Sequence, residues 1–216
     1  MIRLAVFDCD GTLVDGQAAI CETMEEAFAA AGLVAPPRGA IRRMVGLSLP
    51  QALLRLAPDA DADARARVVE AYKDGFRGRR TDGRVDEPLF DGIAETLTRL
   101  EDAGWLLAVA TGKSDRGLVS CLEGHGIRQR FVSLQTADRH PSKPHPAMLQ
   151  AALDDAGAMA EDSVMIGDTS FDIEMAVACG VRAVGVAWGY HEAQELRRAG
   201  AEAVAETPAE LAELLA

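Results

Sequence analysis

Residues 4–15 read LAVFDCDGTLVD, and this stretch decides how the rest of the chain is interpreted. An apolar run ends at Asp8, and Asp10 follows after one intervening residue. The run predicts a strand that is buried on both faces, so the two carboxylates stand at the end of a buried strand. Like charges this close repel, and burying them is costly unless a counter-charge is present. The stretch therefore predicts a site that needs added positive charge.

The composition limits the kinds of partner. The chain has 216 residues, with 22 Lys plus Arg against 34 Asp plus Glu, so its formal net charge is −12. This length fits one medium domain, or a core domain with a small insert. A surface this acidic repels nucleic acid and anionic lipid, so we expect neither as a partner. An anionic substrate must then be attracted by local positive charge.

The cysteines, the N-terminal residues and the lengths of the apolar runs indicate the compartment in which the protein is expected. Four cysteines form neither a C-x-x-C pair nor a metal-ligand spacing, which is typical of reduced thiols in a cytoplasmic protein. The acidic pair within residues 1–15 argues against a signal peptide. No apolar run approaches the roughly 20 residues that span a bilayer, so we expect no membrane segment.

Five short apolar segments predict buried parallel strands, and most of the intervals between them carry helical periodicity. Strands that alternate with helices indicate an α/β domain with a mostly parallel, Rossmann-like sheet. Further helices are predicted at 91–103, near 192–199 and at 208–215. The predicted strands are 3–7, 105–110, 131–134, 163–166 and 182–187.

One interval interrupts this alternation. About eighty residues with helical periodicity and no good strand separate the first strand from the helix at 91, and a loop of that length is rarely unstructured. We interpret 15–82 as an inserted all-helical cap domain. The α/β core would then comprise 1–14 and 83–216.

Polar residues end three of the predicted strands, and a fourth polar group lies in a proline-rich loop. Asp8 and Asp10 follow the first strand, Thr111 and Gly112 the second, and Asp168 the fourth, with Asp172 shortly after it. Ligands of open α/β sheets bind beyond the carboxyl ends of the strands. If these residues share one site, the first strand lies between the second and the fourth, and the strand order is 5-4-1-2-3.

Each of these positions also has an ordinary structural interpretation. An Asp after a strand is often a helix cap, and Lys143 in HPSKPHP could be a surface lysine. The stretch TGKS resembles a P-loop, but Leu107 stands where that motif requires glycine. His140 and His145 lack a helical metal-binding spacing. What argues for a site is the occurrence of all four signals in this order.

In that order the motifs resemble those of the haloacid dehalogenase superfamily, close to its phosphoglycolate phosphatase-like branch with a helical cap. The motif D-x-D-G-T-L-x-D is met from Asp8 to Asp15, and G-D-T-x-x-D from Gly167 to Asp172. Thr111 and Lys143 match the two short motifs between them. The resemblance covers residue 3 to about 190.

The resemblance implies a Mg²⁺-dependent phosphatase that hydrolyses a small-molecule phosphate monoester through an aspartyl-phosphate. Asp8 would be the nucleophile and Asp10 the acid and base. Mg²⁺ would be held by Asp8, Asp168 and the backbone carbonyl of Asp10, with Asp172 as a supporting partner. Thr111 and backbone N–H groups near Gly11 and Gly112 would hold the phosphoryl oxygens, and Lys143 would add a second positive charge.

Other functions stay open at this point. A sugar phosphomutase similar to β-phosphoglucomutase, or a pyrophosphatase, would use the same core. Asp10 argues against a dehalogenase, whose leaving halide needs no proton. A response-regulator receiver also uses Asp, Thr and Lys around Mg²⁺, but would be shorter and lack the insert. A protein that only binds would be expected to have lost one of the four motif residues Asp8, Asp10, Lys143 and Asp168, and none is lost.

The cap is expected to read the rest of the substrate. Its stretch AIRRMVGLSLPQ resembles the substrate-facing loop of caps in this family, which makes Arg42, Arg43, Gly46 and Ser48 candidates for substrate binding. An arginine fork suits bidentate contact with a carboxylate or phosphate. That interpretation favours compact, doubly anionic substrates such as phosphoglycolate or pyrophosphate. The alternative is an ordinary helix junction with Ser48 as an N-cap and both arginines in solvent.

Overall fold

A computed structural model describes residues 2–83 and 85–216, and in it the strands form one parallel sheet of order β3-β2-β1-β4-β5-β6. The predicted order of the first five strands is confirmed. The strand count is corrected from five to six, because Ala203–Ala205 pairs with β5 at the edge. The strands are β1 (Arg3–Phe7), β2 (Trp105–Thr111), β3 (Phe131–Thr136), β4 (Ser163–Gly167), β5 (Arg182–Val186) and β6 (Ala203–Ala205).

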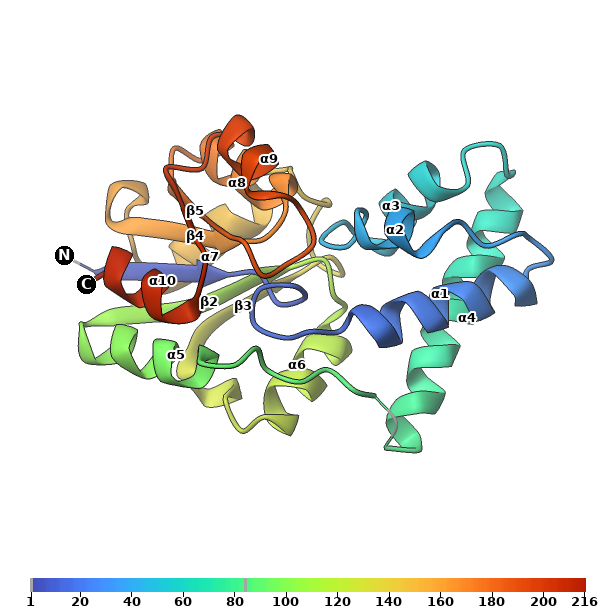
Figure 1. The fold of residues 1–216 in the computed structure, drawn as a ribbon, viewed down its shortest axis with the longest axis horizontal. Helices are drawn as coiled ribbons and strands as arrows, with labels where there is room; N and C mark the ends of the chain where they lie inside the picture. The colour runs from blue at the N-terminus through green and yellow to red at the C-terminus, as the bar shows by residue number, and fades with distance from the viewer. Residues whose placement is uncertain (1, 84) are drawn as a thin grey trace.

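Helices cover both faces of this sheet (Figure 1). One face packs against α5 (Ile93–Asp102), α6 (Asp115–Gly124) and α10 (Pro208–Leu214). The other packs against α7 (Ala147–Ala156), α8 (Ser170–Ala178) and α9 (Ala193–Ala199). Burial on both faces explains why the strands contain apolar runs in place of alternating patterns.

Local signals fix the ends of several core helices. In α5, Ile93, Leu97 and Leu100 share the buried face, and Gly104 follows the helix with a φ of 86°, which favours glycine. In α6, the Ser114 side chain accepts a hydrogen bond from the Gly117 N–H at 3.1 Å and caps the helix. Two short 3₁₀ helices, Arg128–Arg130 and Ala160–Asp162, precede β3 and β4.

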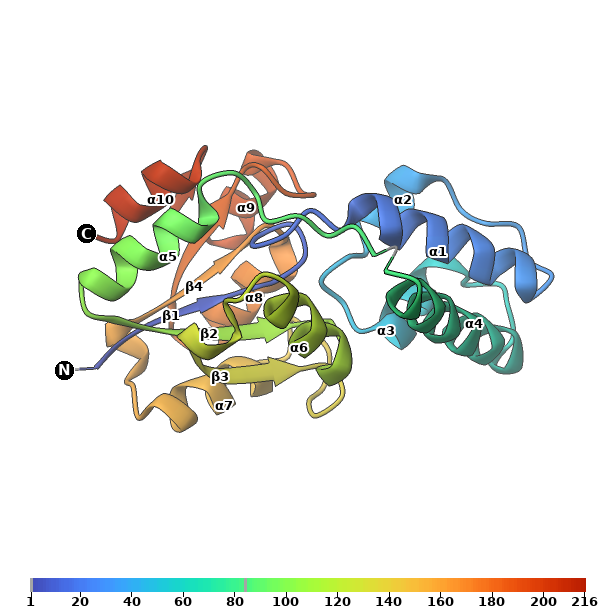
Figure 2. The same cartoon turned by 90° about the horizontal axis from the view of Figure 1, so that it is seen from below.

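The long interval after β1 is helical, and its helices lie together beyond one end of the sheet (Figures 1 and 2). They are α1 (Gln17–Ala30), α2 (Arg38–Arg42), α3 (Leu49–Leu56) and α4 (Ala62–Thr81). They enclose an apolar cluster of their own that includes Met24, Phe28, Leu53 and Val68. Both termini lie at the opposite end of the sheet. The helical group therefore faces the carboxyl ends of the strands, where the polar motifs stand. Within the described residues, no helix is both long and apolar enough to cross a membrane.

Candidate active site

The parallel pairing of β1 with β4 brings two motif aspartates together. The Asp8 N–H continues the ladder by donating to the Ile166 carbonyl at 2.9 Å, and Asp168 directly follows β4. Together with Asp172 in the first turn of α8, they form a buried cluster whose carboxylate oxygens lie within 4.8 Å of one another. Three carboxylates at this separation could hold a metal ion, and hard divalent cations prefer such oxygen ligands.

Asp8 has one engaged and one free oxygen. Its Oδ1 accepts a hydrogen bond from the Cys9 N–H at 2.6 Å and lies 3.0 Å from Lys143 Nζ. Its Oδ2 is buried and has no hydrogen-bond partner. Burial raises the pKa of Asp8 to about 7, with Asp172 adding to the rise and Lys143 opposing it. An unpaired buried carboxylate oxygen is costly, so this atom is suited to contact an electrophile or a cation.

Lys143 supplies part of the counter-charge. Its ammonium group is fully buried and donates to Asp172 Oδ1 at 2.6 Å. Burial by itself would lower the Lys143 pKa, but Asp172 and Asp8 raise it, so the lysine stays charged. Asp172 also caps α8, because its Oδ2 accepts from the N–H and the hydroxyl of Thr169. The lysine therefore has a fixed position between two carboxylates.

The positive charge does not balance the cluster. Burial, followed by repulsion from Asp172 and Asp8, raises the pKa of Asp168 well above its ordinary value. Among the described residues, Lys143 is the cation paired with the cluster, against three carboxylates. A divalent cation therefore fits the charge deficit and the free oxygen of Asp8.

Asp168 is held by a segment that sequence reasoning missed. Its Oδ1 accepts from the Thr12 hydroxyl at 2.9 Å, and its Oδ2 accepts from the Tyr190 N–H at 2.9 Å. Glycine is required on both sides, because a Cβ on Gly11 or on Gly189 would lie 2.2 Å from an Asp168 side-chain atom. The segment around Tyr190 follows β5. The strand-end reasoning that found the other motifs could have found it, had it been applied to the fifth strand.

Asp10 lies apart from the three-carboxylate cluster and has its own counter-ion. Lys113 Nζ lies 3.0 Å from Asp10 Oδ1 and 2.6 Å from Glu87 Oε1, and all three side chains are nearly buried. Burial raises the Asp10 pKa, and Lys113 acts in the opposite direction. No motif in the sequence predicted a role for Lys113 or Glu87. The signal for Lys113 was its position directly after the Thr111–Gly112 motif.

The Thr111–Gly112 motif at the end of β2 packs against a loop between α2 and α3. Thr111 is buried at the end of β2, and a Cβ on Gly112 would lie 2.6 Å from the carbonyl oxygens of Gly46 and Leu47. On the same loop, the Ser48 N–H donates to Ser142 Oγ at 2.8 Å. Gly46 has a φ of 95°, and a Cβ there would come within 3.8 Å of Asp8 Oδ2. The loop with Gly46 and Ser48 thus closes over the cluster.

The two candidate arginines lie elsewhere. Arg43 forms a bidentate ion pair with Glu195 of α9, with its shortest contact at 2.7 Å, and Arg42 donates to Gln17 at 3.2 Å. Both line a separate cavity of about 300 Å³ beside Trp188. The structure therefore does not bring Arg42 and Arg43 to the cavity that Asp10, Thr111, Gly46 and Ser48 line. This differs from the expectation that both arginines face the substrate. The ion pair of Arg43 could not be predicted, because Glu195 is far away in the sequence.

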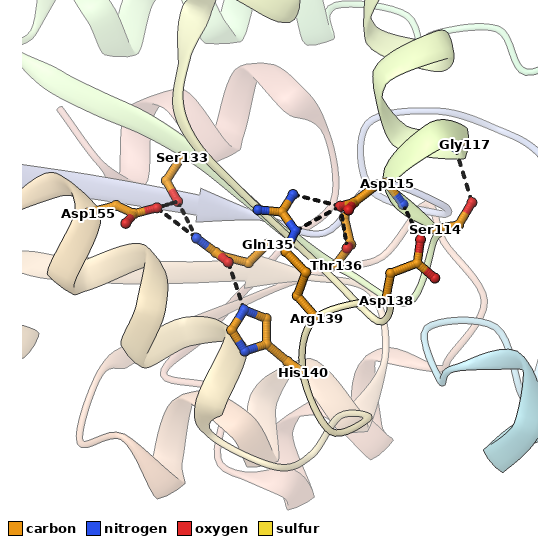
Figure 3. Close-up of polar contacts among 10 residues, drawn as sticks. All are labelled: Ser114, Asp115, Gly117, Ser133, Gln135, Thr136, Asp138, Arg139, His140 and Asp155. Carbon is orange, nitrogen blue, oxygen red and sulfur yellow. Dashed lines mark hydrogen bonds and ion pairs between the residues drawn. The ribbon is translucent and has the colours of Figure 1, made fainter.

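A polar network fixes the loop that carries the buried lysine (Figure 3). Gln135 of β3 donates to Asp155 at 2.7 Å and lies 2.7 Å from the Nε2 of His140. Arg139 pairs with Asp115 at 2.6 Å, which ties the loop to the start of α6. His140 thus has a structural partner. The network thus anchors Arg139 and His140, which precede Lys143 in the same loop.

Comparisons with known proteins agree with this architecture. The sequence pattern described as haloacid dehalogenase-like hydrolase matches residues 5–186. A probable phosphatase, IndB, from Dickeya dadantii is 34% identical over 214 residues, covering 98% of this chain and 92% of the relative. A phosphoglycolate phosphatase from Vibrio parahaemolyticus is 29% identical, covering 100% and 96%. The crystal structure of a hydrolase from Pseudomonas syringae is 25% identical, has a TM-score of 0.86, and covers 99% and 97%.

Proposed function

This chain belongs to the haloacid dehalogenase-like hydrolases, and we propose that it hydrolyses a small-molecule phosphate monoester with Asp8 as the nucleophile. The observation that carries the proposal is the Asp8 carboxylate, which is fully buried, with Lys143 on one oxygen and no partner on the other. A nucleophile of this kind needs a fixed position and a nearby cation, since its target is a dianion.

The chemistry follows from the residues in two steps. An Asp8 oxygen attacks phosphorus, the ester P–O bond breaks, and Asp10 donates its proton to the leaving oxygen. Asp10 then takes a proton from water, which attacks the aspartyl-phosphate and releases inorganic phosphate. Burial raises the pKa of Asp10, and a shift in this direction supports the role of proton donor.

Lys143, Thr111 and the backbone N–H groups near Gly11 and Gly112 would hold the phosphoryl oxygens. Asp8, Asp168 and the backbone carbonyl of Asp10 would hold Mg²⁺, which neutralises charge on the phosphoryl group when bound. Asp172 would fix Lys143 from behind, in keeping with their 2.6 Å contact. Thr12 and Tyr190 would orient Asp168.

We also propose that residues 15–82 act as a cap, with the core formed by 1–14 and 83–216. The contacts of the Gly46–Ser48 loop with Gly112 and Ser142 support this division. The cap would exclude bulk water and bind the leaving group. All four cysteines are free, which supports a cytoplasmic location.

The test is release of inorganic phosphate from p-nitrophenyl phosphate by the purified protein. Turnover should require Mg²⁺ and stop in excess chelator. Asp8→Asn should lose several orders of magnitude in kcat, and Asp10→Asn roughly 10²–10⁴-fold. Asp59→Asn, at an exposed position, is the matched control and should keep full activity.

A covalent intermediate provides a second readout. Acid quenching followed by borohydride reduction should convert a phosphorylated Asp8 to homoserine, identifiable by peptide mass spectrometry. An Asp8→Asn protein that retains normal turnover, or full activity in chelator, would contradict the proposal. Phosphate transfer to a sugar hydroxyl in preference to water would indicate a phosphomutase.

A further inference from the structure

A cavity of about 470 Å³ opens beside the side chain of Asp10, between the helices α1–α4 and the core. Its core side includes Thr111, Gly112 and Lys113. Asp10 is the residue proposed to protonate the leaving oxygen, so the leaving alcohol would extend from Asp10 into this space. The following inference therefore rests on the proposed function and concerns the identity of that alcohol.

The helical wall of this cavity is apolar. Met24, Met44, Tyr72 and Phe76 contribute to it, and the rings of Tyr72 and Phe76 pack with their centroids 4.9 Å apart. Phosphoglycolate would place only a carboxymethyl group here. Sites of about 300–1,000 Å³ usually hold far larger ligands, and apolar walls gain from apolar ligand surface. The wall therefore favours an alcohol with an apolar body about the size of a ring.

The same cavity concentrates positive charge in a chain whose formal net charge is −12. Among the described residues, its lining includes five basic side chains, Lys73, Arg77, Arg80, Lys113 and Arg116, and two acidic ones, Asp10 and Asp138. Local charge of this sign attracts an anion against the field of the whole protein.

Most of these cations already have partners. Lys73 pairs with Glu70, Arg77 pairs with Asp74, and Lys113 pairs with Asp10 and Glu87.

Arg80 differs from those three. Within the described residues its guanidinium has no ion pair, and it lies 5.7 Å from the centroid of the Phe76 ring. One of its nitrogens, Nη2, comes within 3.3 Å of the position of a Cβ on Gly117, so Arg80 reaches from α4 to α6. A half-buried guanidinium beside an aromatic ring has a fixed place and free donors. It is suited to an anionic group at the far end of a ligand.

We propose that the substrate is the phosphate monoester of an alcohol with a ring-sized apolar body and a distal anionic group, which Arg80 binds. The phosphoryl group would lie at Asp8, the ester oxygen at Asp10, the body against Tyr72 and Phe76, and the second anion at Arg80. This replaces the compact, doubly anionic substrate expected from the sequence with a longer one. Arg80 takes the role that the sequence suggested for Arg42 and Arg43.

The test is a matched set of four esters: ethyl phosphate, phosphoglycolate, benzyl phosphate and 4-carboxybenzyl phosphate. They vary size and distal charge independently. We expect kcat/KM to rise about tenfold from ethyl to benzyl phosphate, through apolar contact. A further rise of about tenfold should follow from benzyl to 4-carboxybenzyl phosphate, through a charge-assisted hydrogen bond.

Arg80→Met should remove the gain from the carboxylate and leave benzyl phosphate within about twofold of the parent protein. Arg67→Met makes the same change on an exposed face of α4 outside the cavity, and should keep the gain. Ligand-observed NMR provides a readout without turnover, in which 4-(hydroxymethyl)benzoate should bind the parent protein but not Arg80→Met, and glycolate should bind neither.

The possible failures are distinguishable. If none of these esters nor p-nitrophenyl phosphate is hydrolysed, the proposed function is wrong, and the NMR measurement still tests the cavity. If p-nitrophenyl phosphate is hydrolysed but phosphoglycolate is preferred over both benzyl esters, the inference is overturned. A carboxylate gain that survives Arg80→Met would overturn the role of Arg80.

Discussion

Replacing Lys113 with methionine tests how the buried charges around Asp10 are balanced. The side chains of Lys113, Asp10 and Glu87 are only 9%, 11% and 6% exposed, and the lysine lies 3.0 and 2.6 Å from the two carboxylates. Lys113→Met keeps most of the side-chain length but leaves two carboxylates facing each other without a cation. The change therefore isolates the charge.

The expected magnitude follows from these distances. At an effective dielectric near 20, the 3.0 and 2.6 Å contacts amount to about 5.5 and 6.4 kcal/mol before desolvation is counted. Desolvation of the ammonium offsets a large part, and breaking a buried pair from one side costs about 3–5 kcal/mol in practice. Burial already raises the pKa of Asp10, and losing Lys113, which lowers it, moves the pKa further in the direction that eases the repulsion. We therefore expect Lys113→Met to lower the free energy of unfolding by about 3 kcal/mol, near the lower end of that range.

The measurement is urea unfolding at pH 7, followed by the fluorescence of Trp105 and Trp188. In the Lys113→Met background, adding Glu87→Gln should restore about 1 kcal/mol or more, because it removes one of two unpaired charges. Lys73→Met is the control, since the Lys73–Glu70 pair is exposed and its loss should cost under about 0.5 kcal/mol. A Lys113→Met loss below 1 kcal/mol, or a double variant less stable than Lys113→Met, would refute this reasoning.

Three further predictions give separate tests. Gly189→Ala places a Cβ 2.2 Å from that of Asp168, so it should cost about 1–3 kcal/mol of stability and weaken Mg²⁺ binding measured by calorimetry. Gly78→Ala is the control, because a Cβ there has nothing within 4 Å, and it should have neither effect. Equal melting temperatures for Gly189→Ala and Gly78→Ala would contradict this. Glu195→Gln should cost under about 1 kcal/mol at pH 7, because the Arg43 ion pair is largely exposed. Arg43 lowers the Glu195 pKa to about 2 from 4.5, so the stability that the ion pair contributes is present above pH 4.5 and is lost as the pH falls toward 2. A difference in unfolding free energy between Glu195→Gln and the parent protein that is the same at pH 7 and pH 3 would refute this. Arg42→Ala and Arg43→Ala should each leave KM for the best ester within about twofold, since both side chains line the other cavity; a tenfold rise would return them to the substrate site.

The core architecture could be predicted from short stretches of sequence. Apolar strands with Asp8, Thr111 and Asp168 at their ends required the first strand to lie between the second and the fourth, and the sheet has that order. This inference works because a parallel sheet gathers all carboxyl ends at one edge, so topology follows from which strands carry polar ends. The family resemblance also implied that Lys143 and Asp172 belong to one site, and they lie 2.6 Å apart.

Three features needed the folded chain, for physical reasons that differ. The strand Ala203–Ala205 has three residues, too few for a periodic signal, and forms by pairing with β5. Partners such as Lys113 with Glu87, or Arg43 with Glu195, depend on how distant elements pack and which rotamers that packing allows. The cavity beside Asp10 is bounded by helices and loops from separate parts of the chain. Local pattern records which face of an element is apolar, but the volume left between two packed elements exists only after they meet.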